Sequence, residues 1–285
     1  MGRGLVNFEQ IVFDGLAGKL VAERWQAENE RGTVLLLHGG GQTRHSWHRS
    51  GSRFAEAGWT TIAFDARGHG DSAWAPNGDY SMDALVSDLA AVVAELGVEP
   101  VLVGASMGGI TSLLAVGESD VMAGALVLVD VAPRTEPEGV KRILDFMAAA
   151  PNGFATLDDV ADAVSAYNPH RARPENLDGL KKNVRQWADG RWHWHWDPAF
   201  LSVGDEPSRY TRHDRMKAAA ERVDVPTLLV RGAQSDVVSP EGAEELKRLI
   251  PHALVREAKA GHMVAGDDND VFATQVVEFL DATVE

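Results

Sequence analysis

The sequence predicts an α/β fold with a mostly parallel, doubly wound sheet of eight strands and a helical insertion. Apolar runs of strand length alternate with helical segments along most of the 285 residues, a rhythm typical of parallel sheets covered by helices. That length suits one such domain with an insertion. Between 134 and 223 the alternation is lost, and helical patterns follow one another. We therefore expect a core formed by 1–133 and 224–285 and a lid formed by 134–223.

The first half of the chain contains six of the eight expected strands. Residues 6–13 and 20–25 flank the turn-rich segment 14–18 and are expected to form an antiparallel opening hairpin. The other four are short and largely apolar, as expected of strands buried on both faces: 33–38, 59–64, 101–103 and 123–129. Helices are expected at 52–57, at 82–96 behind the N-cap Ser81, and at 110–116.

The second half contains the lid and the last two strands. Helices are expected in the lid at 136–150, 157–167, 177–187 and about 212–221, with a Trp-rich extended ribbon at 191–198. The sheet then resumes with strands at 226–232 and 253–257 and helices at 241–249 and 271–280. An insertion at this position would lie over the carboxyl ends of the strands, where open α/β sheets bind ligands.

The composition excludes several classes of partner. With 27 basic and 42 acidic residues, the formal net charge is −15, which disfavours binding to nucleic acid or to an anionic membrane. The absence of cysteine excludes disulfides, thiol catalysis and thiolate metal sites. No stretch has signal-peptide character or transmembrane length. We expect a cytoplasmic protein that acts on a small-molecule substrate; the oligomeric state is not predicted.

A candidate nucleophile lies between the strand at 101–103 and the helix at 110–116. The pattern Gly104-x-Ser106-x-Gly108 is that of a nucleophile elbow, a sharp strand-to-helix turn that exposes the serine hydroxyl. The two glycines remove Cβ atoms that would clash where strand and helix come close. Free N–H groups at the start of the helix favour developing negative charge.

The strand at 33–38 runs into a glycine-rich loop, His38-Gly39-Gly40-Gly41. Both common phosphate-binding templates fail here, and the loop instead matches the HGGG type that supplies an oxyanion donor. Gly40 is expected to provide that N–H, and His38 to fix the loop structurally. Trp47 is either a wall of the substrate pocket or part of the core.

Two further residues complete a candidate triad. Asp236 and His262 follow successive late strands, so both should lie at the same sheet edge as Ser106. The chain order Ser106, Asp236, His262 differs from the orders found in chymotrypsin and subtilisin. No metal or cofactor is expected. The Trp residues interleaved with His193, His195 and Asp197 favour packing over metal binding, and 267–270 lacks the glycine and glutamate of a calcium loop.

These motifs together resemble the α/β-hydrolase superfamily over nearly the whole chain. The closest resemblance is to its lidded serine esterases, lactonases, C–C bond hydrolases and cofactor-free haloperoxidases. The resemblance implies that Ser106 is the nucleophile, His262 the base and Asp236 the orienting acid, with Gly40 and Met107 N–H groups forming the oxyanion hole. Some relatives place the acid one strand after the elbow, where this chain has Asp130, a residue that could also lie at the substrate pocket.

The expected activity is that of a serine hydrolase cleaving a carboxylic ester or lactone through an acyl-enzyme. A C–C bond hydrolase or cofactor-free perhydrolase with the same triad is the alternative within enzymes. A ligand-binding receptor without turnover is the alternative outside them. Labelling by a fluorophosphonate and a burst of alcohol release from a chromogenic ester would separate these classes.

Overall fold

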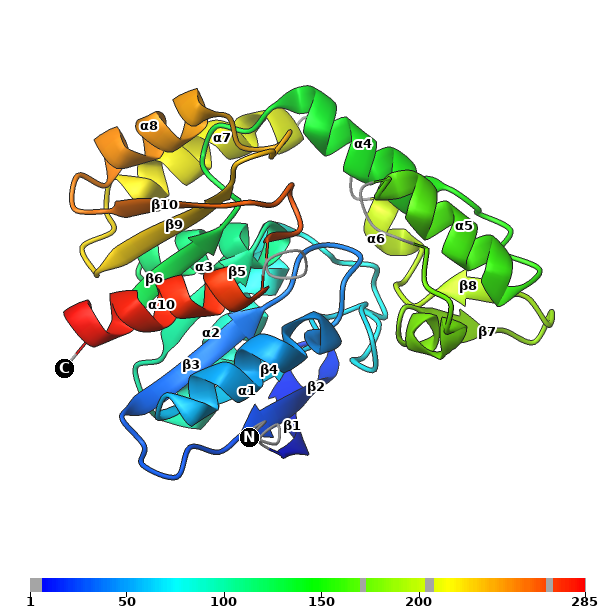
Figure 1. The fold of residues 1–285 in the computed structure, drawn as a ribbon, viewed down its shortest axis with the longest axis horizontal. Coiled ribbons are helices and arrows are strands. Elements are labelled where there is room, and N and C mark those ends of the chain that lie inside the picture. Colours follow the sequence, from blue (N-terminus) through cyan, green and yellow to red (C-terminus); the bar gives the residue numbers. More distant parts are fainter. Residues whose placement is uncertain (1–6, 170–172, 203–207, 265–268, 285) are drawn as a thin grey trace.

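The computed structural model describes residues 7–169, 173–202, 208–264 and 269–284. Its centre is one eight-stranded sheet in the order β1-β2-β4-β3-β5-β6-β9-β10 (Figure 1), which confirms the predicted fold class. β1 and β2 pair antiparallel, as do β2 and β4, and all later pairs are parallel. The strands are β1 (Phe8–Gly15), β2 (Gly18–Trp25), β3 (Gly32–Leu37), β4 (Trp59–Phe64), β5 (Val101–Ala105), β6 (Ala125–Val129), β9 (Thr227–Gly232) and β10 (Leu254–Ala258).

Helices cover both faces of this sheet. α1 (His48–Glu56) and α10 (Asn269–Thr283) lie on one face, and α2 (Met82–Leu96), α3 (Met107–Gly117) and α8 (Pro240–Leu249) on the other. Alternate residues of β3 enter the two cores: Val34 and Leu36 pack under α1 and α10, whereas Leu35 and Leu37 pack under the other layer. Burying each such side chain contributes roughly 1.5–3 kcal/mol.

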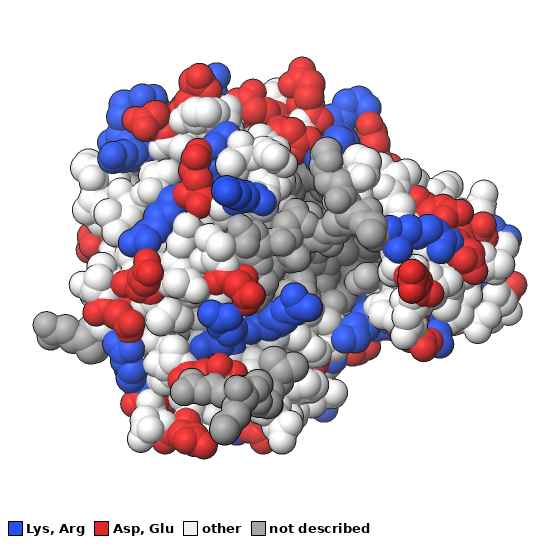
Figure 2. All heavy atoms as spheres, viewed as in Figure 1, with Lys and Arg blue, Asp and Glu red and all other residues white. Residues whose placement is uncertain are grey.

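The helix ends follow the sequence signals. The Ser81 side chain accepts a hydrogen bond from Ala84 N at the start of α2, and Gly97 ends that helix with φ 66°. Within the described residues, no helix is both long and apolar enough to cross a membrane. On the face shown in Figure 2, Lys and Arg side chains are interspersed with Asp and Glu side chains.

The insertion forms a separate lobe beside the carboxyl edge of the sheet (Figure 1). It contains α4 (Pro137–Ala148), α5 (Leu157–Tyr167), a 3-10 helix η2 (Leu177–Lys182), β7 (Val184–Gln186), β8 (Trp192–Trp194) and α6 (Ala199–Ser202). The lobe has its own hydrophobic cluster, in which Met147, Phe154, Trp194 and Trp196 are buried. A capping box between Thr156 and Asp159 begins α5 where the sequence predicts it.

The predicted helix at 177–187 is wrong in its second half. Only 177–182 is helical, and Val184–Gln186 pairs antiparallel with Trp192–Trp194. The Trp187 ring stacks on His193 with 3.8 Å between centroids, and Gly190 turns the chain with φ 77°. Pairing with the Trp-rich ribbon therefore overrides the local helical pattern.

The predicted lid boundary at 223 also differs from the structure. α7 (Ser208–Ala220) packs on α3, and its Met216, Ala219 and Ala220 side chains belong to the core beneath the sheet. A Cβ atom on Gly117 of α3 would lie 2.2 Å from the carbonyl oxygen of Ala219. Small residues on both helices thus permit a close contact that makes α7 part of the core layer.

Candidate active site

Ser106 joins β5 to α3 in a strained turn. Its backbone has φ 46° and ψ −113°, a conformation that side-chain-bearing residues rarely adopt. A Cβ on Gly104 would lie 2.4 Å from the Gly108 carbonyl oxygen, and one on Gly108 would lie 2.4 Å from that of Leu37. Only glycine permits this approach, which confirms that Gly104 and Gly108 are needed because a Cβ atom at either position would clash. Ser106 remains partly exposed at the carboxyl edge of the sheet.

The start of α3 directs backbone N–H groups toward the same place. The Ser106 N–H donates to Val129 O of β6 at 3.2 Å, which fixes the turn against the neighbouring strand. Met107 is the first residue of α3, so its N–H has no partner within the helix. The positive end of the helix dipole therefore lies beside the serine hydroxyl.

Asp130 follows β6 directly and is completely buried. Its Oδ1 accepts a hydrogen bond from Gly232 N at 2.8 Å. Its Oδ2 accepts one from Ser235 Oγ at 2.6 Å and contacts His262 Nδ1 at 2.7 Å. The backbone at Asp130 has φ 48°, so this residue also occupies a strained position. Two donors, Gly232 N and Ser235 Oγ, thus hold one buried carboxylate against His262.

Asp236 does not contact His262, and the prediction that it orients this histidine is wrong. Its side chain is 41% exposed, and both oxygens accept hydrogen bonds from Arg142, at 2.7 and 3.0 Å. The cause is the loop after β9, in which the Ser235 hydroxyl accepts hydrogen bonds from Val237 N and Val238 N. This turn directs Ser235 toward Asp130 and sends Asp236 outward against α4.

His262 lies in the turn that follows β10, with 8% of its side chain exposed. A Cβ on Gly232 would lie 2.2 Å from the Gly261 carbonyl oxygen, so this turn rests directly on the end of β9. Because Asp130 occupies the Nδ1 side, the proton is assigned to Nδ1 and the lone pair to Nε2. Among the described residues, no hydrogen bond joins His262 to the Ser106 hydroxyl. Such bonds commonly tighten only when substrate is bound.

The loop after β3 is held by histidines whose ring nitrogens bind its backbone. Gly41 N donates to His69 Nε2 at 3.1 Å, and Gly41 O lies 3.3 Å from His195 Nε2. His38 fixes the loop as predicted, with Nδ1 2.8 Å from Gly39 O and Nε2 accepting from Ala66 N at 2.9 Å. Burial lowers the pKa of His38 to about 4 and that of His69 to about 3. These rings are therefore neutral near pH 7.

Gly40 lies at the tip of this loop and faces the lid. A Cβ placed on Gly40 would lie 3.8 Å from Met147 Sδ and from the Phe200 ring. Within the described part of the chain, the Gly40 N–H has no hydrogen-bond partner. Gln42 Nε2, two residues on, lies 3.0 Å from Met263 Sδ, which links the loop to the turn that carries His262.

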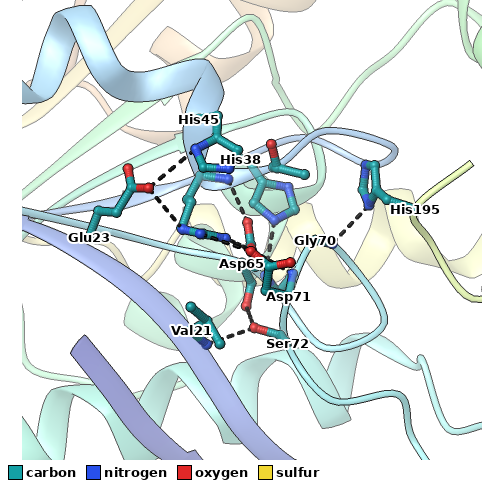
Figure 3. A network of polar contacts seen from close by, with 12 residues as sticks. Val21, Glu23, His38, His45, Asp65, Gly70, Asp71, Ser72 and His195 are labelled. Carbon is teal, nitrogen blue, oxygen red and sulfur yellow. Dashed lines mark hydrogen bonds and ion pairs between the residues drawn. The ribbon is translucent and has the colours of Figure 1, made fainter. Parts of the chain in front are cut away.

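A buried charge network supports the loop from behind (Figure 3). The Arg44 guanidinium contacts Glu23, Asp65 and Asp71, and the Arg44 N–H donates to Asp65 Oδ1 at 2.7 Å. Burial acts to raise the pKa of Glu23, but hydrogen bonds with His45 and His48 outweigh it and lower this pKa to about 2. Asp65 therefore holds the backbone of the loop after β3 at Arg44, and the Arg44 side chain joins that loop to β2 through Glu23.

Trp47 and Asp130, the two candidate residues of the substrate pocket, are both buried and do not line it. Trp47 is 1% exposed and packs against Phe272 of α10, 5.9 Å between ring centroids, so it belongs to the core. Asp130 lies behind His262 and has no exposed surface, so it does not line a pocket.

The side chains of His193, His195 and Asp197 in the Trp-rich ribbon do not point toward a common metal position. His193 pairs with Asp189, His195 Nδ1 accepts from Gly70 N at 2.8 Å, and Asp197 accepts from the Tyr80 hydroxyl. The three side chains thus bind three different partners. Residues 267 and 268 of the acidic run lie outside the described residues.

Comparison with known proteins extends these observations. Esterase Rv0045c of Mycobacterium tuberculosis is 33% identical over 260 residues, covering 88% of this chain and 83% of the esterase. Its solved structure matches with a TM-score of 0.77 over 98% of this chain and 93% of that one. The sn-1-specific diacylglycerol lipase ABHD11 of Mus musculus is 27% identical, covering 87% and 80% of the two chains. The structure of an E-2-(acetamidomethylene)succinate hydrolase matches with a TM-score of 0.81 at 22% identity, covering 96% and 100%.

The family described as "alpha/beta hydrolase fold" matches residues 32–268. This range contains the elbow, the glycine-rich loop, Asp130 and His262, and most of the sheet. The chain belongs to the α/β-hydrolase family.

Proposed function

We propose that this protein is a serine hydrolase that cleaves a small carboxylic ester, with Ser106, His262 and Asp130 as its catalytic triad. The observation that carries the proposal is the 2.7 Å contact between His262 Nδ1 and the buried Asp130 carboxylate. A buried carboxylate that fixes a histidine tautomer beside an exposed serine is the arrangement that activates serine as a nucleophile.

In the first half of the reaction, Ser106 Oγ attacks the ester carbonyl while His262 Nε2 accepts the hydroxyl proton. Asp130 stabilises the imidazolium that forms. The carbonyl oxygen becomes an oxyanion, which accepts hydrogen bonds from the N–H groups of Gly40 and Met107. The intermediate collapses, the alcohol leaves with the proton from His262, and an acyl-enzyme remains. Water then attacks the acyl group by the same route and releases the acid.

The lid side chains near the glycine-rich loop favour a substrate with an apolar portion. Met147 and Phe200 cover the Gly40 side of the loop, and the Trp196 ring lies 3.3 Å from a Cβ placed on Gly41. Apolar walls with few polar groups are typical of pockets that bind small ligands. Relatives named as an esterase and as lipases also favour an ester substrate.

The proposal is tested with a fluorophosphonate probe and a series of p-nitrophenyl esters. Wild-type protein should be labelled once, at Ser106, and should release a burst of p-nitrophenol equal to the enzyme concentration. Ser106→Ala should abolish both the label and the burst while retaining its fold by circular dichroism. A lactone and a vinylogous 1,5-diketone belong in the same panel. Turnover of the diketone alone would replace ester hydrolysis by C–C bond cleavage, and near-normal turnover by Ser106→Ala would refute the mechanism.

A further inference from the structure

A second cluster of histidine and glutamate side chains lies outside the proposed triad. It combines Glu23 of β2, His45 of the 3-10 helix η1 (Arg44–Trp47) and His48, the first residue of α1. His48 Nε2 lies 2.5 Å from Glu23 Oε2, and His45 Nδ1 lies 3.2 Å from Glu23 Oε1. The two ring nitrogens are 3.1 Å apart. Potential ligand atoms from three separate elements thus lie within hydrogen-bonding distance of one another.

The spacing of these atoms resembles that of metal ligands. Zinc binds imidazole nitrogen at about 2.0–2.1 Å, so two nitrogens in a tetrahedral site lie roughly 3.3 Å apart. His45 Nδ1 and His48 Nε2 also lie within 3.2 Å of the Glu23 carboxylate oxygens. In the neutral imidazole tautomer that leaves this nitrogen unprotonated, its lone pair points into the cluster beside the carboxylate.

Surrounding residues hold two of the three side chains, His48 and Glu23, in place. The His48 ring packs against Phe8 and Trp25, with centroid distances of 5.0 and 5.7 Å. Glu23 is held through Oε1, which lies 3.2 Å from Arg44 Nε. Outer contacts of this kind orient metal ligands and raise affinity.

The buried charges around the cluster favour a cation. Glu23 and Asp65 are 3% and 0% exposed as side chains, and the single guanidinium buried between them, that of Arg44, is 4% exposed. Asp71, the third carboxylate on Arg44, is 45% exposed and also pairs with Arg185 of β7. Two buried carboxylates therefore share one buried cation, and an additional positive charge beside Glu23 offsets the excess.

We propose that Glu23, His45 and His48 form a binding site for a divalent transition-metal ion, with Zn²⁺ as the natural fit. Two imidazoles and one carboxylate are a ligand set that zinc accepts, leaving one position for water. The His45 and His48 side chains are 19% and 30% exposed, so this fourth position faces solvent. Mg²⁺ and Ca²⁺ prefer sites built entirely from oxygen atoms and fit this site poorly.

The metal is expected to stabilise the loop that carries Gly40. His45 follows Arg44, and the Arg44 N–H is bound to Asp65, which also accepts from Asp71 N at 2.9 Å. Figure 3 shows the direct contact between Glu23 of β2 and His45, and a metal ion bound at this contact would fix the end of the loop to β2. Because an ion bound only to the folded state stabilises that state, Tm should rise with zinc and then saturate.

Calorimetric titration with ZnCl₂ after treatment with a chelator tests the proposal. Wild-type protein should bind one equivalent, and the bound site should exclude Mg²⁺ at a hundredfold excess. His45→Gln should weaken zinc binding about 100-fold or more, since it removes a direct ligand, and should abolish the zinc-dependent rise in Tm. In the absence of metal it should retain its esterase activity within about threefold.

His213→Gln is the matched control, because His213 also faces a glutamate, Glu245 at 3.0 Å, but no second histidine of the described residues contacts it. It should bind zinc as wild type does. If His45→Gln folds poorly, His48→Gln replaces it with the same expected loss. Absence of a stoichiometric zinc site in wild type, or undiminished zinc binding in the His45 and His48 variants, would overturn the proposal.

Discussion

The loops that follow β6 and β9 each bring an aspartate to the same edge of the sheet, but the two carboxylates have different surroundings. Asp130 is fully buried and accepts from Gly232 N, Ser235 Oγ and His262. Asp236 is 41% exposed and pairs with an exposed guanidinium. A catalytic carboxylate must be held rigidly in a site from which water is excluded. Burial and the number of fixed donors distinguish these two residues, whereas residue type and the edge of the sheet at which they lie do not.

Among the tests of this comparison, the largest expected effect belongs to Asp130→Asn. The amide conserves size but stabilises the wrong tautomer of His262 and no longer stabilises the imidazolium. An acid-to-amide change in a serine triad costs about 10⁴ in turnover, and we expect a loss of kcat of that order on a p-nitrophenyl ester. Thermal unfolding should show a folded variant. A kcat within tenfold of wild type would remove Asp130 from the triad.

The sequence predicted the sheet more accurately than the site. Strands such as β3 and β6 are continuous apolar runs bounded by turn residues, and their order in the chain determines which strand ends share an edge. The lid was harder to predict, because the sequence of η2 and β7 has the pattern of one continuous helix. Only the pairing of β7 with the ribbon at 191–198 shows that the second part is a strand. Side-chain pairing across loops carries no comparable pattern in the sequence.

The incorrect prediction that Asp236 is the orienting acid shows this limit of sequence patterns. Asp130 follows β6 immediately, whereas Asp236 comes after Ser235 in a loop whose direction is set by hydrogen bonds to that hydroxyl. A serine that binds two N–H groups while donating to a carboxylate is visible only in three dimensions. The cluster of Glu23, His45 and His48 was missed for the same reason, since Glu23 lies more than 20 residues from the histidines.

The contrast between buried and exposed groups extends to the histidines and predicts how stability depends on pH. The folded pKa values of His38 and His69 are about 4 and 3, below the unfolded value of about 6.5. Above pH 6.5 neither state binds the proton. Below it the unfolded chain is protonated first, so the free energy of unfolding falls as pH drops toward the folded pKa. From pH 6.5 to 5 the loss is up to about 2 kcal/mol per histidine.

Urea unfolding at pH 7 and pH 5 measures this dependence. His69→Gln should have a smaller difference between the two pH values than wild type. His213→Gln, which removes an exposed histidine, should leave the difference nearly unchanged. Equal differences in all three proteins would contradict the assignment of neutral, buried rings.

A smaller effect is expected from Ser235→Ala, because this residue acts through Asp130. Loss of the 2.6 Å hydrogen bond removes a charge-assisted contact worth roughly 1.5–3 kcal/mol and loosens the carboxylate, so kcat should fall about tenfold. With one donor fewer, Asp130 also stabilises the imidazolium more strongly, and the acid limb of the kcat/KM profile should move to higher pH. Ser239→Ala, which removes only the N-cap of α8, should lower stability and leave that profile in place.

The smallest effect on kcat is expected from Asp236→Asn. This variant tests the comparison most directly, because the two aspartates should then differ strongly in their effect on kcat. The side chain is 41% exposed and its partner Arg142 is 46% exposed, and exposed ion pairs contribute only about 0–1 kcal/mol. Arg142 belongs to α4, so the pair joins the lid to the loop after β9, and Arg142→Gln should have the same small effect. We expect kcat within about threefold of wild type for both variants, and any change to lie in KM, because a looser lid alters binding before chemistry. A loss of kcat in Asp236→Asn comparable with that in Asp130→Asn would mean that the loop after β9 rearranges to bring Asp236 to His262 during turnover.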